Sequence, residues 1–154
     1  YDGIAGETGD PQATVVVQPM CEAGVETVVG VVHDPLFGSL LMFGLGGVLT
    51  DLLDDRVFRS LPLLDVDAGR MWRGLRSAAL LTGYRGTSPT DTARLEDVLL
   101  RVARLAEDFP QIAELDINPL LVLPDSASAL DVKLRIRAVG EEPDALVRAL
   151  PEPR

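Results

Sequence analysis

The sequence lacks the features that secreted and membrane-spanning proteins need. Cys21 is the single cysteine among 154 residues, so no disulfide can form within the chain. The most apolar stretch, Leu36–Leu49, contains Ser39 and four glycines and is shorter than the roughly 20 residues of a membrane-spanning helix. The first residues also lack the basic start and the apolar run of a signal peptide. We therefore expect a cytoplasmic protein without a membrane partner.

Positive charge is also scarce. The chain has 14 lysine and arginine residues against 24 aspartate and glutamate residues, which gives a formal net charge of -10. Binding to nucleic acid normally depends on a basic patch, whereas the arginines here are scattered among carboxylates, so the composition argues against nucleic acid as a partner. Lys133 is the only lysine, which leaves one candidate for a lysine that contacts phosphate. Apolar residues make up 47% of the chain, enough for a hydrophobic core.

The first part of the chain predicts paired β-strands. Residues 1–12 are polar and rich in glycine, and we interpret them as the flexible cut end of a longer protein. Two β-branched runs, at 13–18 and 25–32, predict a hairpin. Two further runs, at 39–43 and 48–53, flank three glycines and predict a second strand pair that turns there.

Two helices are predicted next. From Asp65 to Ala79, apolar residues recur at steps of three and four, as on one face of a helix. A second helix is predicted from Ser88 to Asp108, with Ser88 as its cap, Asp91 closing a capping box and a continuous apolar stripe along one side.

The last part predicts strands again. They are expected at 112–118, ending at Pro119, at 120–123 and at 129–139. The last of them alternates apolar and charged residues, so one of its faces should be wholly polar. The whole pattern predicts an α+β domain over residues 13–139, with an antiparallel or mixed sheet and flanking helices, followed by a tail at 140–154.

An oxygen-rich row of side chains is the clearest chemical feature. Glu114, Asp116 and Asn118 are two residues apart, so in a strand they leave from the same face. Asp131 begins the polar face of the following strand, and oxygens from two adjacent strands suit a magnesium ion that carries a nucleotide's phosphates. The alternative interpretation is a solvated strand face with turn residues at Asn118 and Pro119.

Several sequence blocks together resemble a known family. They are VVQPM at 16–20, GVETVVGVVHDPLFG at 24–38, FGLGGVLTDLLDDRVFRSLPL at 43–63, LLTGYRG at 80–86, ELDINPLLV at 114–122 and ALDVKLRI at 129–136. In order and spacing they resemble the ATP-grasp domain of the ADP-forming acyl-CoA synthetases, a group that includes acetate–CoA ligase and a subunit of succinyl-CoA synthetase. The Arg-rich and Asp-rich composition of these blocks also resembles that of actinobacterial proteins in which such a region is fused to a GCN5-type lysine acetyltransferase.

The resemblance implies roles for individual residues. The implied nucleotide-binding residues are Gln18, Pro19, Met20 and Glu26. The first three would offer backbone hydrogen bonds to adenine, and Glu26 would hold the ribose. The implied metal-binding residues are Asp116, Asn118 and Asp131. Arg59 is the implied contact to a phosphate or an acyl phosphate, and Asp51 and Asp55 match acidic positions of the family.

The resemblance also implies a function for the whole. By this resemblance, the chain would be the nucleotide-binding part of an NDP-forming acid–CoA ligase. In such a ligase, ATP and Mg²⁺ phosphorylate a carboxylate or a histidine before the acyl group passes to CoA on another domain. The family's phosphate-binding lysine and glycine-rich loop precede the adenine hinge, and nothing before Val15 supplies them. We therefore expect a partial ATP-grasp unit that is inactive alone and depends on the remaining ATP-grasp subdomain and the CoA-binding domains of a parent protein. A degenerate regulatory nucleotide-binding module of a lysine acetyltransferase and a structural assembly domain are the alternatives.

Overall fold

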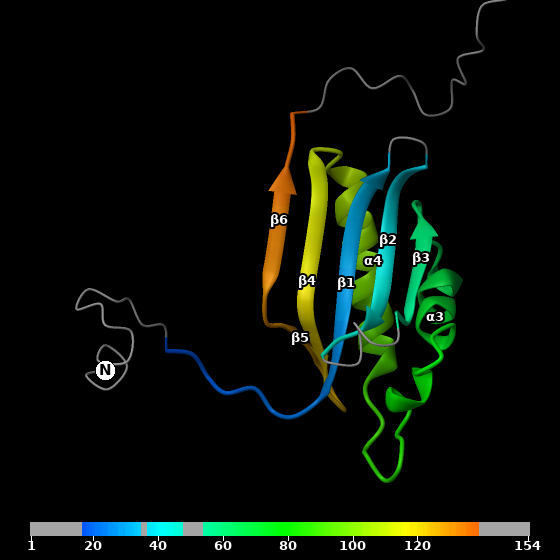
Figure 1. Ribbon diagram of the computed structural model, residues 1–154, viewed down its shortest axis with the longest axis vertical. Helices are drawn as coiled ribbons and strands as arrows, with labels where there is room; N and C mark the ends of the chain where they lie inside the picture. The colour runs from blue at the N-terminus through cyan, green and yellow to red at the C-terminus, as the bar shows by residue number, and fades with distance from the viewer. Residues whose placement is uncertain (1–16, 35–36, 48–53, 139–154) are drawn as a thin grey trace, which may run out of the picture.

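One antiparallel sheet organises the protein. The computed structural model describes residues 17–34, 37–47 and 54–138. Its strands are β1 (Val25–Asp34), β2 (Gly38–Leu45), β3 (Arg56–Ser60), β4 (Ile112–Val122), β5 (Ala127–Ala129) and β6 (Val132–Ile136). Their order is β3-β2-β1-β4-β5, β6 also pairs with β4, and all of these pairings are antiparallel (Figure 1).

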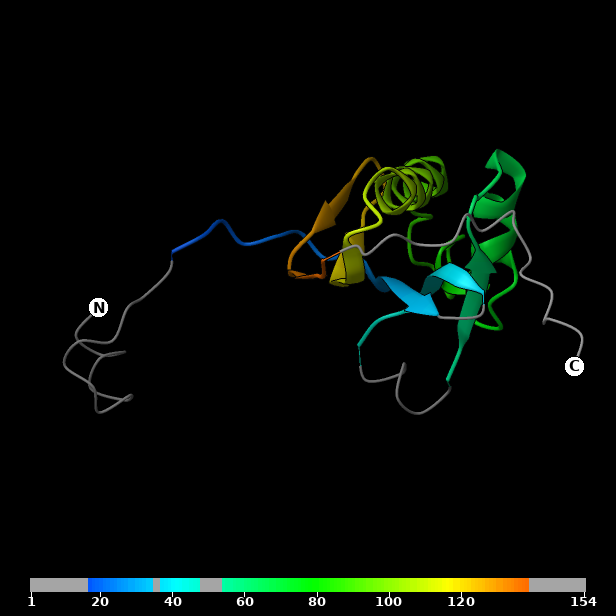
Figure 2. The same ribbon diagram turned by 90° about the horizontal axis from the view of Figure 1, so that it is seen from above.

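The helices cover one face of this sheet. They are α3 (Asp65–Arg73), the short 3-10 helix η1 (Ala78–Leu80) and α4 (Thr92–Asp108). α3 packs against β2 and β3, whereas α4 packs against β1, β2, β4 and β5 (Figure 2). The predicted α+β class with flanking helices is therefore confirmed. In the part of the chain that the structure describes, no helix is long and apolar enough to cross a membrane.

The core lies between the sheet and the helices because side chains alternate along each strand. Val29 and Val31 of β1, and Leu41 and Phe43 of β2, point to the helix side and are buried. α4 presents its apolar stripe to them, with Leu99 completely buried. The opposite face of the sheet has no helix over it among the described residues, and its Val32 and Phe58 side chains are exposed.

The pairing of the first strands differs from the prediction. β1 forms as predicted, but its two edges pair with β2 and β4, so the predicted hairpin with 13–18 is wrong and residues 17–24 are not in a strand. β2 does pair with the strand that follows it, but it runs through Gly44, and β3 begins only at Arg56. The strand predicted at 48–53 lies outside the described residues. A β-branched run indicates a strand without indicating its partner, which is why the pairing was missed.

The helix boundaries also shift. α3 covers only part of the helix predicted from Asp65 to Ala79, because Gly74 follows its last turn and residues 78–80 form the separate 3-10 turn. α4 begins later than Ser88, since Asp91 caps it by accepting a hydrogen bond from the backbone N–H of Arg94 at 2.9 Å.

The last strands show two more differences. β4 continues through Pro119, where a strand end was predicted. Its register with β1 shifts opposite Thr27–Val29, and this irregularity accommodates a residue that has no backbone N–H. The alternation along β6 predicted one wholly polar face, but the apolar residues Val132, Leu134 and Ile136 are exposed as well, because α4 packs over β4 and β5 and not over β6.

Candidate functional site

The open face of the sheet contains a cavity of about 420 Å³. Its lining residues are Glu26, Val28, Met42, Gly44, Gly47, Arg56, Asp116, Asn118 and Pro119. Strand register brings them together: Arg56, Gly44 and Val28 are neighbours across β3, β2 and β1. The cavity therefore belongs to the sheet itself and joins segments that are distant in the sequence.

Glu26 enters the cavity from the start of β1, where the glycines that follow β2 pack against it. The Gly46 N–H donates to the Glu26 carbonyl oxygen at 2.7 Å, and a Cβ on Gly46 would lie 3.1 Å from the Glu26 Cβ. Gly47 has φ +74°, and a Cβ there would lie 3.1 Å from Glu26 Oε2. These two glycines therefore let the chain after β2 lie directly beside the Glu26 carboxylate.

Asp116 and Asn118 enter the same cavity from β4, so the structure brings these two predicted residues together on one face. A carboxylate and an amide oxygen are ligands that Mg²⁺ prefers, and a Mg²⁺ ion bound to phosphate needs only one or two protein oxygens. This donor set fits such an ion. Within residues 17–34, 37–47 and 54–138, no group of three or more His, Cys, Asp and Glu side chains is arranged to hold a metal.

The other acids of the predicted row have partners of their own. The Glu114 carboxylate accepts a hydrogen bond from Arg135 Nε at 3.0 Å. The Asp131 carbonyl oxygen accepts from the Asn118 N–H at 3.0 Å, which confirms that the segments around these two residues pair. The Asp131 carboxylate, however, is 3.7 Å from Lys133 Nζ, and Asp131 is not among the cavity-lining residues.

The basic residue in the cavity is Arg56 and not the predicted Arg59. Arg59 pairs in register with Leu41, which is buried under the helices, so Arg59 lies on the helix side of β3. Its guanidinium Nη1 donates to the Phe58 carbonyl oxygen at 2.8 Å. The two arginines are three residues apart and therefore lie on opposite faces of a strand. The sequence alone does not show which of the two arginines faces the cavity. The pairing of Arg56 with Gly44, another residue of the cavity lining, shows that it is Arg56.

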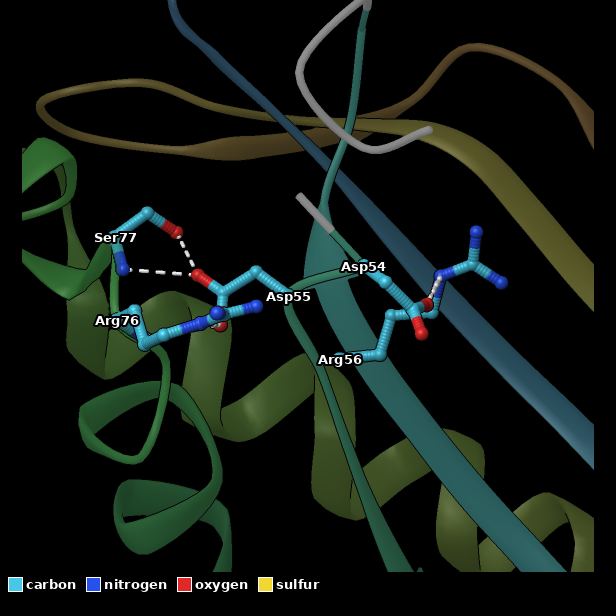
Figure 3. A network of polar contacts seen from close by, with 5 residues as sticks. All are labelled: Asp54, Asp55, Arg56, Arg76 and Ser77. Carbon is cyan, nitrogen blue, oxygen red and sulfur yellow. Dashed lines mark hydrogen bonds and ion pairs between the residues drawn. The ribbon is translucent and has the colours of Figure 1, made fainter. Parts of the chain in front are cut away.

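Asp55 is a structural residue in this arrangement. Its carboxylate accepts hydrogen bonds from the backbone N–H of Arg76 at 3.0 Å, from that of Ser77 at 2.9 Å and from the Ser77 hydroxyl (Figure 3). Burial raises the pKa of Asp55, but these hydrogen bonds and the charge of Arg76 outweigh burial and hold the pKa below its ordinary value. Asp55 points away from Arg56 and joins β3 to the segment after α3 (Figure 3).

The residues predicted to contact adenine are not part of the described cavity lining. Gln18, Pro19 and Met20 are exposed in the extended segment that precedes β1 and do not line the cavity (Figure 1). Asp51 lies outside the described residues. The described site thus combines Glu26 and Asp116 with one amide and one guanidinium, which is a set suited to a phosphate anion accompanied by a divalent cation.

Comparison with known proteins identifies the chain as an ATP-grasp domain, the family that its sequence blocks resemble. A family model of the ATP-grasp domain matches residues 7–136. The beta subunit of acetate–CoA ligase (ADP-forming) I of Pyrococcus furiosus is 39% identical over 120 residues, which cover 78% of this chain and 52% of that protein. Acetate–CoA ligase (ADP-forming) I of Archaeoglobus fulgidus is 38% identical over 128 residues, which cover 83% of this chain and 18% of that protein.

A solved structure is similar to the chain in both fold and sequence. The acetyl-coenzyme A synthetase 1 of Candidatus Korarchaeum cryptofilum, in complex with coenzyme A and Mg-AMPPCP, has a TM-score of 0.73 and 38% sequence identity. The match covers 76% of this chain and 55% of that one. The chain therefore spans about half the length, or less, of the relatives that it matches.

Proposed function

The chain belongs to the ATP-grasp domain family, and from this premise we propose that it forms one wall of the nucleotide site of an NDP-forming acid–CoA ligase. The observation that carries the proposal is the cavity on the open sheet face, where Glu26, Asp116, Asn118 and Arg56 meet. An open polar face is what a subdomain needs if a nucleotide is to be enclosed between it and a second subdomain.

Asp116 and Asn118 would hold a magnesium ion together with the phosphates, and Asp131 would join them after separating from Lys133. When bound, the ion would neutralise phosphate charge and favour transfer of the terminal phosphoryl group. Glu26 would accept hydrogen bonds from the ribose hydroxyls at the edge of the cavity. Gln18, Pro19 and Met20 would contact the adenine once the segment before β1 folds over the base.

The reaction proposed for the complete protein is acyl-CoA formation coupled to ATP hydrolysis through a phosphorylated intermediate. Two relatives are named acetate–CoA ligases, and the structural neighbour was solved with coenzyme A and Mg-AMPPCP, which supports ATP, Mg²⁺ and CoA as the ligands. Coenzyme A would bind to other domains, and this chain alone would not turn over ATP. Both named relatives and the structural neighbour are CoA ligases or synthetases, which favours the ligase over a regulatory module of an acetyltransferase.

The proposal is tested by titrating ¹⁵N-labelled protein with ADP, with and without Mg²⁺, and following amide chemical shifts. We expect shifts around Glu26, Gly44 and Asp116 that saturate only with Mg²⁺, because the acidic residues repel a free nucleotide. Asp116→Asn should abolish the Mg²⁺ dependence. Glu114→Gln is the matched control: it lies on the same strand and the same face but pairs with Arg135 and does not line the cavity. Shifts on the helix side, or equal binding without Mg²⁺, would contradict the proposal.

A further inference from the structure

Arg56 has a special place in the cavity. Among the described residues that line it, Arg56 alone has a cationic side chain, while Glu26 and Asp116 are acidic. It lies on β3, at the far end from β4, with β2 and β1 between them. Three strand spacings separate β3 from β4, about 14 Å at ~4.8 Å for each spacing. The cavity thus has a cation on one side and the oxygen ligands on the other.

A glycine on the neighbouring strand leaves room for the Arg56 side chain to lie across the open face of the sheet. Its register partner on β2 is Gly44, and a Cβ on Gly44 would lie 3.2 Å from the Arg56 Cγ and 3.1 Å from the Asp55 carbonyl oxygen. Any larger residue at position 44 would press against the arginine stem. Beyond Gly44 on β1 is Val28, another lining residue, so the row from β3 leads directly into the cavity.

The present partner of Arg56 holds it only loosely. Arg56 Nε lies 3.6 Å from the Asp54 carboxylate, whose side chain is 88% exposed (Figure 3). An exposed ion pair at this distance contributes little to stability, so the guanidinium can exchange partners at small cost. A phosphoryl group is a stronger partner, because two of its oxygens can accept parallel hydrogen bonds from one guanidinium.

We propose that Arg56 is a phosphate-binding residue of the nucleotide site and contacts the phosphoryl oxygens from the side opposite the Asp116 and Asn118 ligands. This inference rests on the proposed function, since it assigns a residue to the same site. It differs from the sequence-based expectation, which gave that role to Arg59. Lys133, the other candidate, is 3.7 Å from Asp131 and does not line the cavity.

The test compares Arg56→Gln with Arg59→Gln by the same amide-shift titration, using Mg-ADP and, separately, adenosine. Arg59→Gln is the matched control because it removes an identical charge from the same strand on the helix side. Arg56→Gln should weaken Mg-ADP binding about fivefold or more, since a charge-assisted hydrogen bond is lost, and should leave adenosine binding unchanged. Arg56→Lys, which keeps the charge without the planar fork, should recover part of the affinity.

The outcomes separate this inference from the proposed function. If wild-type protein binds Mg-ADP and Arg56→Gln binds it equally well, Arg56 is not a phosphate ligand, while the proposed function stands. Equal losses in Arg56→Gln and Arg59→Gln would show a general charge effect and would also overturn the inference. If the wild-type protein shows no saturable shifts with Mg-ADP, both proposals fail. Near-identical thermal unfolding of the variants verifies that each one is folded.

Discussion

Replacing Asp55 by asparagine should destabilise the protein more than its position at the edge of the sheet suggests. The Asp55 residue is 8% exposed, and its two carboxylate oxygens serve three donors from Arg76 and Ser77. An asparagine keeps one carbonyl oxygen, so one of the two backbone N–H groups would face an amide NH₂ and lose its acceptor. A buried donor without a partner costs about 1–3 kcal/mol, and we expect a loss of about 2 kcal/mol in the free energy of unfolding.

The effect should also depend on pH in a defined direction. The pKa of Asp55 is below its ordinary value of 3.8 in the folded protein. A carboxyl group whose pKa is lower in the folded state stabilises the fold above its unfolded pKa, and this contribution is lost as pH falls through the folded pKa. The difference between wild type and Asp55→Asn should therefore be complete at pH 7 and should shrink below about pH 4.

Urea unfolding followed by tryptophan fluorescence measures this difference. Trp72 is the single tryptophan and is 6% exposed, so its emission reports loss of the packing between α3 and the sheet. Asp54→Asn is the control, because the neighbouring carboxylate is exposed and its one ion pair within the described part of the chain is the 3.6 Å contact with Arg56. It should change stability by less than about 0.5 kcal/mol. Equal effects of the two substitutions, or a difference that persists unchanged at pH 3, would show that the ionised Asp55 carboxylate does not stabilise the fold through these hydrogen bonds.

Further predictions concern the core, the glycines and nucleotide affinity. Leu99→Ala should cost about 2–5 kcal/mol in urea unfolding, because Leu99 is completely buried on α4, and a change below about 0.5 kcal/mol would contradict that packing. Gly47→Ala should weaken Mg-ADP binding more than Gly38→Ala does: both have positive φ, but only the new Cβ at position 47 would meet the Glu26 carboxylate, at 3.1 Å. Comparable Mg-ADP affinities of the two variants would contradict this role of Gly47. The chain should bind Mg-ATP no tighter than about millimolar, some 4 kcal/mol, without turnover. Micromolar affinity by calorimetry would show that the chain already contains a complete nucleotide site.

Patterns that depend on one segment were predictable from the sequence. The apolar stripe of α4 indicated Leu95, Val98, Leu99 and Val102 as buried. Three of them are buried, and Val98 is partly buried against the same core. The two-residue spacing of Asp116 and Asn118 indicated a shared strand face, and both line the cavity. Each of these predictions needs only the period of a helix or a strand.

Features that depend on pairing between segments were not predictable in the same way. Arg56 and Arg59 look equivalent in the sequence, and only the register with β2 places Arg56 on the open face. The alternation in β6 correctly separates two faces, but it does not reveal that α4 leaves Val132 and Leu134 exposed. Local periodicity separates the two faces of a strand, but the tertiary arrangement decides whether a helix covers the apolar face.

The position of a bound metal shows whether the open-face cavity is the nucleotide site. Mn²⁺ can replace Mg²⁺ in phosphate sites and broadens the NMR signals of nearby amides, so it should be added with ADP to the ¹⁵N-labelled chain. We expect the strongest broadening at Asp116, Asn118 and their neighbours on the open face, and weaker broadening at Leu95 to Ala106 on α4, on the other side of the sheet. Broadening centred on the helix face, or spread over the acidic surface without selection, would contradict the assignment of the open-face cavity as the nucleotide site.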